Sequence, residues 1–152
     1  MSSTILADRL SRSWRELGGI LASRRLVAAL SVDADAGLTP TKLRALGALG
    51  EHGPLRVSEL ADRMSIEETT GTRLADRLEA AGLARREPDP NDRRAITIVL
   101  TRAGERLASE MAQRRLEFFR DVLDALAPDE RSELVRLTEK ATAVLHEELV
   151  AR

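Results

Sequence analysis

The chain has 152 residues, a net charge of −1 and 43% hydrophobic residues, which suits one domain or a small domain with helical extensions. It has no cysteine and only two histidines, so disulfides and thiol chemistry are excluded and neither a metal site nor a cofactor is expected. No apolar run reaches the roughly 18 residues of a membrane span. The N-terminus also lacks a signal-peptide pattern, so a cytoplasmic protein without a membrane partner is expected.

The N-terminal third of the chain predicts two helices. Apolar residues recur at spacings of three and four over residues 4–30, which indicates a long helix that the stretch 31–37, SVDADAG, ends. Thr39 then offers the side chain of an N-cap, and Pro40 has the φ of a first helical residue. A short helix should therefore start here and stop near HGP, residues 52–54.

Residues 55–64 predict a short strand followed by a short helix. LRV, residues 55–57, is long enough for a small strand. Ser58 is expected to cap the helix of about six residues that follows, ELADRM.

Residues 65–82 predict a second helix close behind. Ser65 is expected to cap it, with Glu68 three residues later completing a capping box. Gly82 should end it. The expected buried stripe of this helix consists of Leu74, Leu78 and Ala81. Two short helices separated by a turn of three or four residues form a helix-turn-helix.

A β-hairpin is predicted next, with strands at LARRE, residues 83–87, and AITIVL, residues 95–100. A helix-turn-helix followed by such a hairpin is a winged helix. Thr101 is expected to cap a long helix that the stretch Ala127–Asp129 ends, and a last amphipathic helix follows. The predicted fold is mainly α with a small β-hairpin wing.

The middle of the chain resembles the MarR (multiple antibiotic resistance regulator) family of bacterial transcription factors. VSELADRMSIEETTGTRLADRLEAAGLARRE looks like the family's helix-turn-helix and first wing strand. DRRAITIVLT matches the wing pattern Asp-x-Arg, five residues, Leu-Thr, and these motifs cover about residues 38–107. The resemblance implies a winged helix-turn-helix over residues 38–101 that binds double-stranded DNA. It also implies that residues 1–37 and 102–152 form helices that interleave with a second copy in a homodimer.

The second helix of the motif is the expected reader of the major groove, because a helix fits this groove and its N-terminal residues reach base edges. Arg73 is a candidate to read guanine, and Arg77 and Ser58 are candidates for phosphate. The candidates for DNA binding on the outer face of that helix are Thr69, Thr70, Thr72, Arg73 and Arg77. The alternative is that these are ordinary solvated helix residues. Glu68 is expected in the cap and Glu67 to one side.

The wing adds Arg93 and Arg94 at the end of a loop that two prolines stiffen. An arginine on a narrow projection suits the minor groove, and Arg94 is the expected occupant, with Arg93 on phosphates. The resemblance implies that Asp92 forms an ion pair with Arg94 and orients it. A solvated wing tip is the alternative. Arg56, Arg63, Arg85 and Arg86 are secondary candidates for phosphate or for pairing with neighbouring carboxylates.

A small-molecule effector is a further expectation from the resemblance, which places it between the dimer helices and the DNA-binding lobe. The candidate lining residues are Trp14, His52, Phe118 and Phe119, which could equally be core or surface residues. The leading hypothesis is a dimeric repressor of a pseudo-palindromic operator. A winged-helix module that binds protein is the alternative, favoured by the near-zero charge. An enzyme is disfavoured, because the sequence has no cysteine, tyrosine or glycine-rich phosphate motif.

Overall fold

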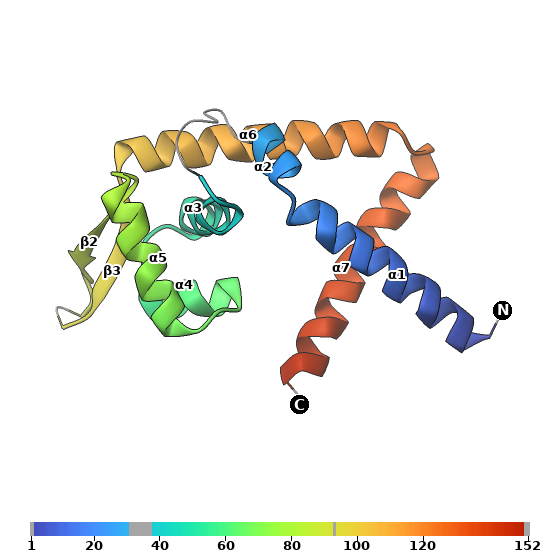
Figure 1. Ribbon diagram of the computed structural model, residues 1–152, viewed down its shortest axis with the longest axis horizontal. Helices are drawn as coiled ribbons and strands as arrows, with labels where there is room; N and C mark the ends of the chain where they lie inside the picture. The colour runs from blue at the N-terminus through green and yellow to red at the C-terminus, as the bar shows by residue number, and fades with distance from the viewer. Residues whose placement is uncertain (1, 31–37, 93, 151–152) are drawn as a thin grey trace. The chain divides into compact units, whose positions relative to one another are not determined.

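The computed structural model describes residues 2–30, 38–92 and 94–150 (Figure 1). The chain divides into two compact units, residues 1–115 and residues 116–152. The elements described are, in order, α1 (Ser3–Leu21), α2 (Arg24–Leu30), α3 (Pro40–His52), β1 (Leu55–Arg56), α4 (Val57–Met64), α5 (Glu68–Ala80), β2 (Ala84–Pro88), β3 (Ile96–Leu100), α6 (Arg102–Asp124) and α7 (Pro128–Val150). The predicted fold, mainly α with a β-hairpin wing, is confirmed.

The predicted single helix over residues 4–30 is wrong, because α1 ends at Leu21 and α2 begins at Arg24. The side chain of Ser23 accepts a hydrogen bond from the backbone N–H of Leu26 at 3.2 Å. This bond satisfies an N–H group at the start of α2, so a serine in the apolar pattern starts a new helix. The stretch 31–37, which was expected to end the helix, lies outside the described residues.

Helix α3 begins and ends as predicted. The Thr39 hydroxyl accepts from the Lys42 N–H at 3.3 Å, and Pro40 is the first helical residue. The helix ends at His52, and Gly53 follows with φ of 77°, a left-handed conformation that glycine adopts without steric cost.

The turn between α4 and α5 differs from the prediction. Ser65 is not the N-cap of α5, and the predicted capping box with Glu68 is wrong. Ser65 instead ends α4 with φ of 53°, and Glu67 is the N-cap residue of α5 without a side-chain cap. The physical reason lies in its neighbours: Met64 is buried in the core and Ile66 packs against it. The chain must therefore turn at the residue between them.

Helix α4 also starts earlier than predicted. Its N-cap residue is Arg56, whose N–H donates to the Glu59 carboxylate at 2.7 Å, so Ser58 lies inside the first turn. In α5, Leu74 and Leu78 are buried as predicted. Ala81 is exposed, because it follows the last turn of the helix. Gly82 ends the helix with φ of 69°, as predicted.

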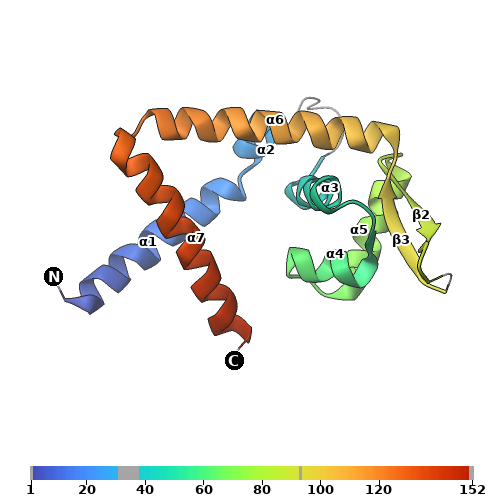
Figure 2. The same ribbon diagram turned by 180° about the vertical axis from the view of Figure 1, so that it is seen from behind.

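The three strands form one antiparallel sheet in the order β1-β3-β2, with Leu55 opposite Ile98 and Arg86 also opposite Ile98. Figure 2 shows the sheet beside α3, α4 and α5. One hydrophobic core joins these elements to the start of α6, and its largest fully buried side chains are Leu46, Leu49, Leu60, Leu78 and Ile98. The short sheet therefore fixes the wing to the helix-turn-helix.

Thr101 caps α6 as predicted, since its hydroxyl accepts from the Gly104 N–H at 3.1 Å. The break between α6 and α7 is also confirmed, and the Ala127 N–H donates to the Glu130 carboxylate at 2.9 Å. Apart from Ile96 on β3, the large apolar side chains that remain exposed lie along α1, along the second half of α6 and along α7. They include Leu10, Leu17, Leu116, Leu137 and Leu145. In the parts of the chain that the structure describes, no helix has the length and apolar character of a membrane span.

Candidate nucleic-acid interface

The outer face of α5 carries the residues predicted to read the major groove. Thr69, Thr70, Thr72, Arg73 and Arg77 are all exposed, and Leu74, Ala75 and Leu78 on the other face are buried. Gly71 lets this helix approach α4 closely, because a Cβ there would lie 3.2 Å from the Cβ of Ala61. The hydroxyl of Thr72 donates to the Glu68 carbonyl at 3.1 Å. Ser58 is exposed in the first turn of α4.

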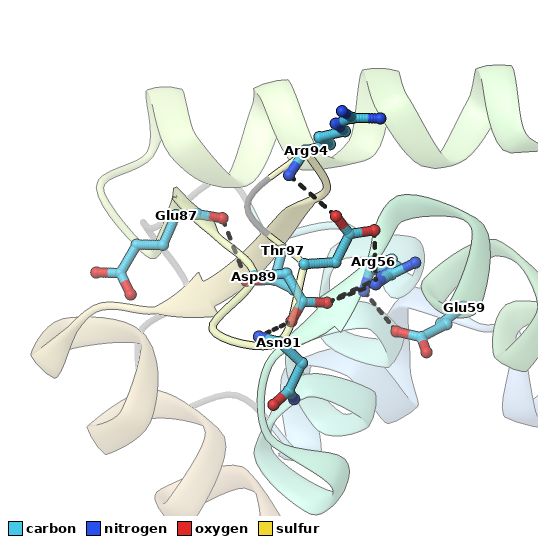
Figure 3. Close-up of polar contacts among 8 residues, drawn as sticks. Arg56, Glu59, Glu87, Asp89, Asn91, Arg94 and Thr97 are labelled. Atoms are coloured by element: carbon cyan, nitrogen blue, oxygen red, sulfur yellow. Dashed lines mark hydrogen bonds and ion pairs between the residues drawn. The ribbon is translucent and has the colours of Figure 1, made fainter.

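The loop of the wing is held by a buried carboxylate. Asp89 is only 9% exposed, and its Oδ1 accepts from the Asn91 N–H at 2.8 Å. Its Oδ2 accepts from Nε of Arg56 at 3.0 Å, so β1 is tied directly to the wing loop (Figure 3). The N–H of Asp89 donates to the carbonyl of Ala95 at 2.9 Å across the loop. These contacts fix the base of the wing from inside.

Asp92 does not have the predicted ion pair. Its carboxylate lies 3.6 Å from the Arg56 guanidinium, and its other oxygen accepts from the backbone N–H of Arg94 at 3.1 Å. The side chain of Arg94 is exposed and extends away from the Arg56–Asp89 contact in Figure 3. Asp92 thus orients the backbone at Arg94 and not its guanidinium. Arg93, the other predicted wing residue, lies outside the described residues.

The contacts of Asp89 predict a pH dependence of stability. The Asn91 N–H and then Arg56 hold the pKa of Asp89 below its ordinary value of 3.8. Because the folded pKa is lowered, the stabilisation is complete above the ordinary pKa and is lost as pH falls through the folded pKa. We expect Asp89→Asn to have a lower melting temperature than the wild type at neutral pH. The difference between the two melting temperatures should disappear in acid.

Thermal unfolding followed by circular dichroism from neutral pH to about pH 3 measures this gap. Asp62→Asn, at an exposed aspartate of α4, is the matched control and should follow the wild type throughout. A gap for Asp89→Asn that stays constant over the whole pH range would contradict the account.

The arginines of the winged helix fall into two groups. Arg56, Arg85 and Arg86 are held in ion pairs with carboxylates of the same unit. Arg63 contacts the ring of His52 at 3.1 Å. By contrast, within the described residues no hydrogen bond or ion pair joins the guanidinium of Arg73, Arg77 or Arg94 to another side chain. Among the described residues of the winged helix, the arginines whose guanidinium has neither a hydrogen bond nor an ion pair are therefore three of the four that the sequence predicts to contact DNA.

The four candidate effector residues are distributed over three helices. Trp14 is 47% exposed on α1, and His52 is exposed at the end of α3. Phe118 and Phe119 lie side by side on α6 in the second unit, with ring centroids 5.4 Å apart in an edge-to-face arrangement. An open hollow in that unit contains none of the four and is lined by Leu123, Arg131, Ser132, Val135, Arg136 and Glu139. Among the described residues there is no cluster of acidic and histidine side chains that could hold a metal ion.

Comparison with known proteins decides the family. The MarR family model matches residues 36–95. The transcriptional repressor MdtR of Bacillus subtilis is 36% identical over 104 residues, which cover 68% of this chain and 67% of that protein. This chain belongs to the MarR family. As a MarR family member it is a DNA-binding transcriptional regulator and not an enzyme, as the sequence predicts.

Two solved structures extend the MarR likeness over nearly the whole chain. A MarR family protein from Bacillus stearothermophilus is 29% identical, with a TM-score of 0.72 and 99% of both chains covered. BpsR of Bordetella bronchiseptica is 28% identical, and the DNA binding of BpsR is described as regulated by 6-hydroxynicotinic acid. Its TM-score is 0.62, and the match covers 84% of this chain and 98% of BpsR.

Proposed function

We propose that this protein is a dimeric repressor that reads a pseudo-palindromic operator with α5 in the major groove and the wing in the minor groove. The observation that carries the proposal is the division of the arginines. Arg73, Arg77 and Arg94 are exposed and have no ion pair with any other described residue, and their paired neighbours build the scaffold. Arg73 lies in the second turn of α5, where a guanidinium can reach guanine O6 and N7. Arg77, one turn later, is placed for phosphate. The role as a repressor is supported by the likeness to MdtR.

A salt titration tests the DNA-binding proposal. The probe is a fluorescein-labelled duplex that the protein selects from a random-sequence library, and anisotropy gives the affinity. Each phosphate neutralised should contribute about 0.9 to the slope of log K against log salt. An affinity that does not change with salt would contradict the proposed contacts. A module that uses its winged helix only for protein partners would select no duplex at all.

The proposed homodimer rests on the exposed apolar side chains of α1 and α7. On α7 these include Leu137, Val144 and Leu145, whose exposed fractions are 48%, 49% and 44%. Their spacing puts them on one side of the helix. A stripe of this kind is stabilised when a second helix covers it. The proposed dimerisation regions are residues 1–37 and 102–152, with the winged helix over residues 38–101 between them.

A charged substitution on this stripe should separate the dimer. We expect Leu145→Glu to yield a monomer in sedimentation velocity and to weaken operator binding at least tenfold, since one half-site is then read alone. Ala143→Glu introduces the same charge on the opposite side of α7 and should remain dimeric. Equal behaviour of the two variants would contradict the proposed interface.

Release by a small ligand is the last part of the proposal. It is supported by the likeness to BpsR, whose DNA binding is described as regulated by 6-hydroxynicotinic acid. Trp14 is the only tryptophan of the chain, so its fluorescence reports on α1 alone. The proposed effector contacts are Trp14, His52, Phe118 and Phe119. This part of the proposal would be excluded if no aromatic acid in a panel changed either the Trp14 fluorescence or the DNA affinity.

A further inference from the structure

The exposed surface of α5 carries more negative than positive charge. The helix has two arginines, Arg73 and Arg77, and three carboxylates, Glu68, Asp76 and Glu79, a net charge of −1. All five residues are exposed. Duplex DNA presents one negative charge per about 1.7 Å of its axis, so this helix alone would meet repulsion from its own carboxylates.

Arg86 on β2 contacts two of these three carboxylates. Its guanidinium donates to Oδ1 of Asp76 at 2.6 Å and forms a second ion pair with Glu79. The backbone N–H of Arg86 donates to the other carboxylate oxygen of Glu79 at 3.2 Å. The side chain of Arg86 is 31% exposed against 58% for Asp76, so the arginine is more enclosed than the carboxylate that it holds.

The neighbouring paired arginines do not have this arrangement. Arg56 is paired with Asp89 and Asp92 of the wing loop, and Arg85 with Glu87 of its own strand. In the described part of the winged helix, Arg86 alone forms ion pairs with α5. These two carboxylates accept from both terminal nitrogens of its guanidinium.

We propose that Arg86 is a positioning residue for DNA recognition, which offsets one of the two negative charges of Asp76 and Glu79 and holds both carboxylates against the wing. The repulsion between these two carboxylates and the phosphates that Arg73 and Arg77 approach is thereby reduced. The ion pairs of Arg86 with Asp76 and Glu79 also set the distance between α5 and β2. The distance between the major and minor grooves of the operator must match it. This inference rests on the proposed role of α5 as the recognition helix.

The test measures binding of wild type and variants to the selected duplex by anisotropy. Arg86→Met should weaken binding about fivefold, the upper range for an exposed ion pair. Asp76→Asn and Glu79→Gln, added together to Arg86→Met, should restore the affinity to within about twofold of wild type. If Arg86→Met does not fold, Arg86→Gln, which can still donate to Glu79, provides the same comparison.

The rescue separates charge neutralisation from the alternatives. A triple variant that binds as weakly as Arg86→Met would overturn the proposal, because Arg86 would then contact DNA itself or serve only the fold. Arg73→Ala is measured in the same series. If it binds like wild type, the recognition-helix assignment fails. If it binds weakly and the rescue is absent, only the role of Arg86 fails.

Discussion

Replacing Arg94 by alanine is expected to weaken operator binding about tenfold to a hundredfold, the range for loss of one arginine contact to a base. The side chain is exposed, and its backbone N–H is held by Asp92, so the guanidinium is presented by a fixed loop. Removing it should not unfold the wing, because Asp89 and Arg56 hold the loop independently. The slope of log K against log salt should become less steep by about one, as expected for the loss of one phosphate neutralised by a positive charge.

Arg136→Ala is the matched control for Arg94→Ala. It removes the same charge from the chain but breaks only an exposed ion pair with Glu133 within α7. Its affinity should stay within about twofold of wild type, since exposed pairs of this kind contribute little. Unchanged DNA affinity of Arg94→Ala, with an unchanged melting temperature, would overturn the assignment of Arg94 to the groove.

Replacing Gly104 by alanine is expected to lower the free energy of unfolding by about 3 kcal/mol, the upper range for overpacking. A Cβ at this position would lie 2.0 Å from the carbonyl oxygen of Leu83, so backbone must move. That carbonyl also accepts from the Thr101 N–H at 3.1 Å. The clash would push the start of α6 away from Leu83, which leads into β2. DNA affinity should therefore fall together with the free energy of unfolding.

Gly19→Ala is the control for this prediction. Apart from its chain neighbours and the backbone of its own helix, no described atom lies within 4 Å of a Cβ at Gly19, which lies inside α1. Alanine there should raise stability by about 0.5–1 kcal/mol through its better helix propensity. Urea unfolding of both variants measures the difference. A Gly104→Ala variant as stable as wild type would contradict the close packing of α6 on Leu83.

Features set by neighbours in sequence could be predicted from the residues alone. Thr39 and Thr101 cap helices as expected, and Gly82 ends α5, because each depends on hydrogen bonds or a backbone angle within a few residues. Ser65 has the same local signal and a different role. The core decides there, since Met64 and Ile66 must both reach it, and no local pattern contains that requirement.

The candidate site shows the same division. The exposed face of α5 follows from helical period, so Arg73 and Arg77 could be placed from sequence. The partners of the other arginines could not. Arg56 meets Asp89 across 33 residues, and this pair depends on β1 joining the sheet beside β3. The predicted ion pair between Asp92 and Arg94 is wrong for the same reason. The guanidinium of Arg56, which lies on β1, reaches the carboxylate of Asp92 instead.

Hydroxyl-radical footprinting on the selected duplex tests the central claim most directly. If a dimer presents two α5 helices and two wings, the protected sugars should form two segments related by two-fold symmetry. Their centres should lie about one helical turn, or about 10 base pairs, apart. Arg94→Ala should lose the protection of sugars in the minor groove, while protection of guanine N7 from methylation by dimethyl sulfate, which reports on the major groove, should remain. A single asymmetric protected segment, unchanged in Arg94→Ala, would contradict the account.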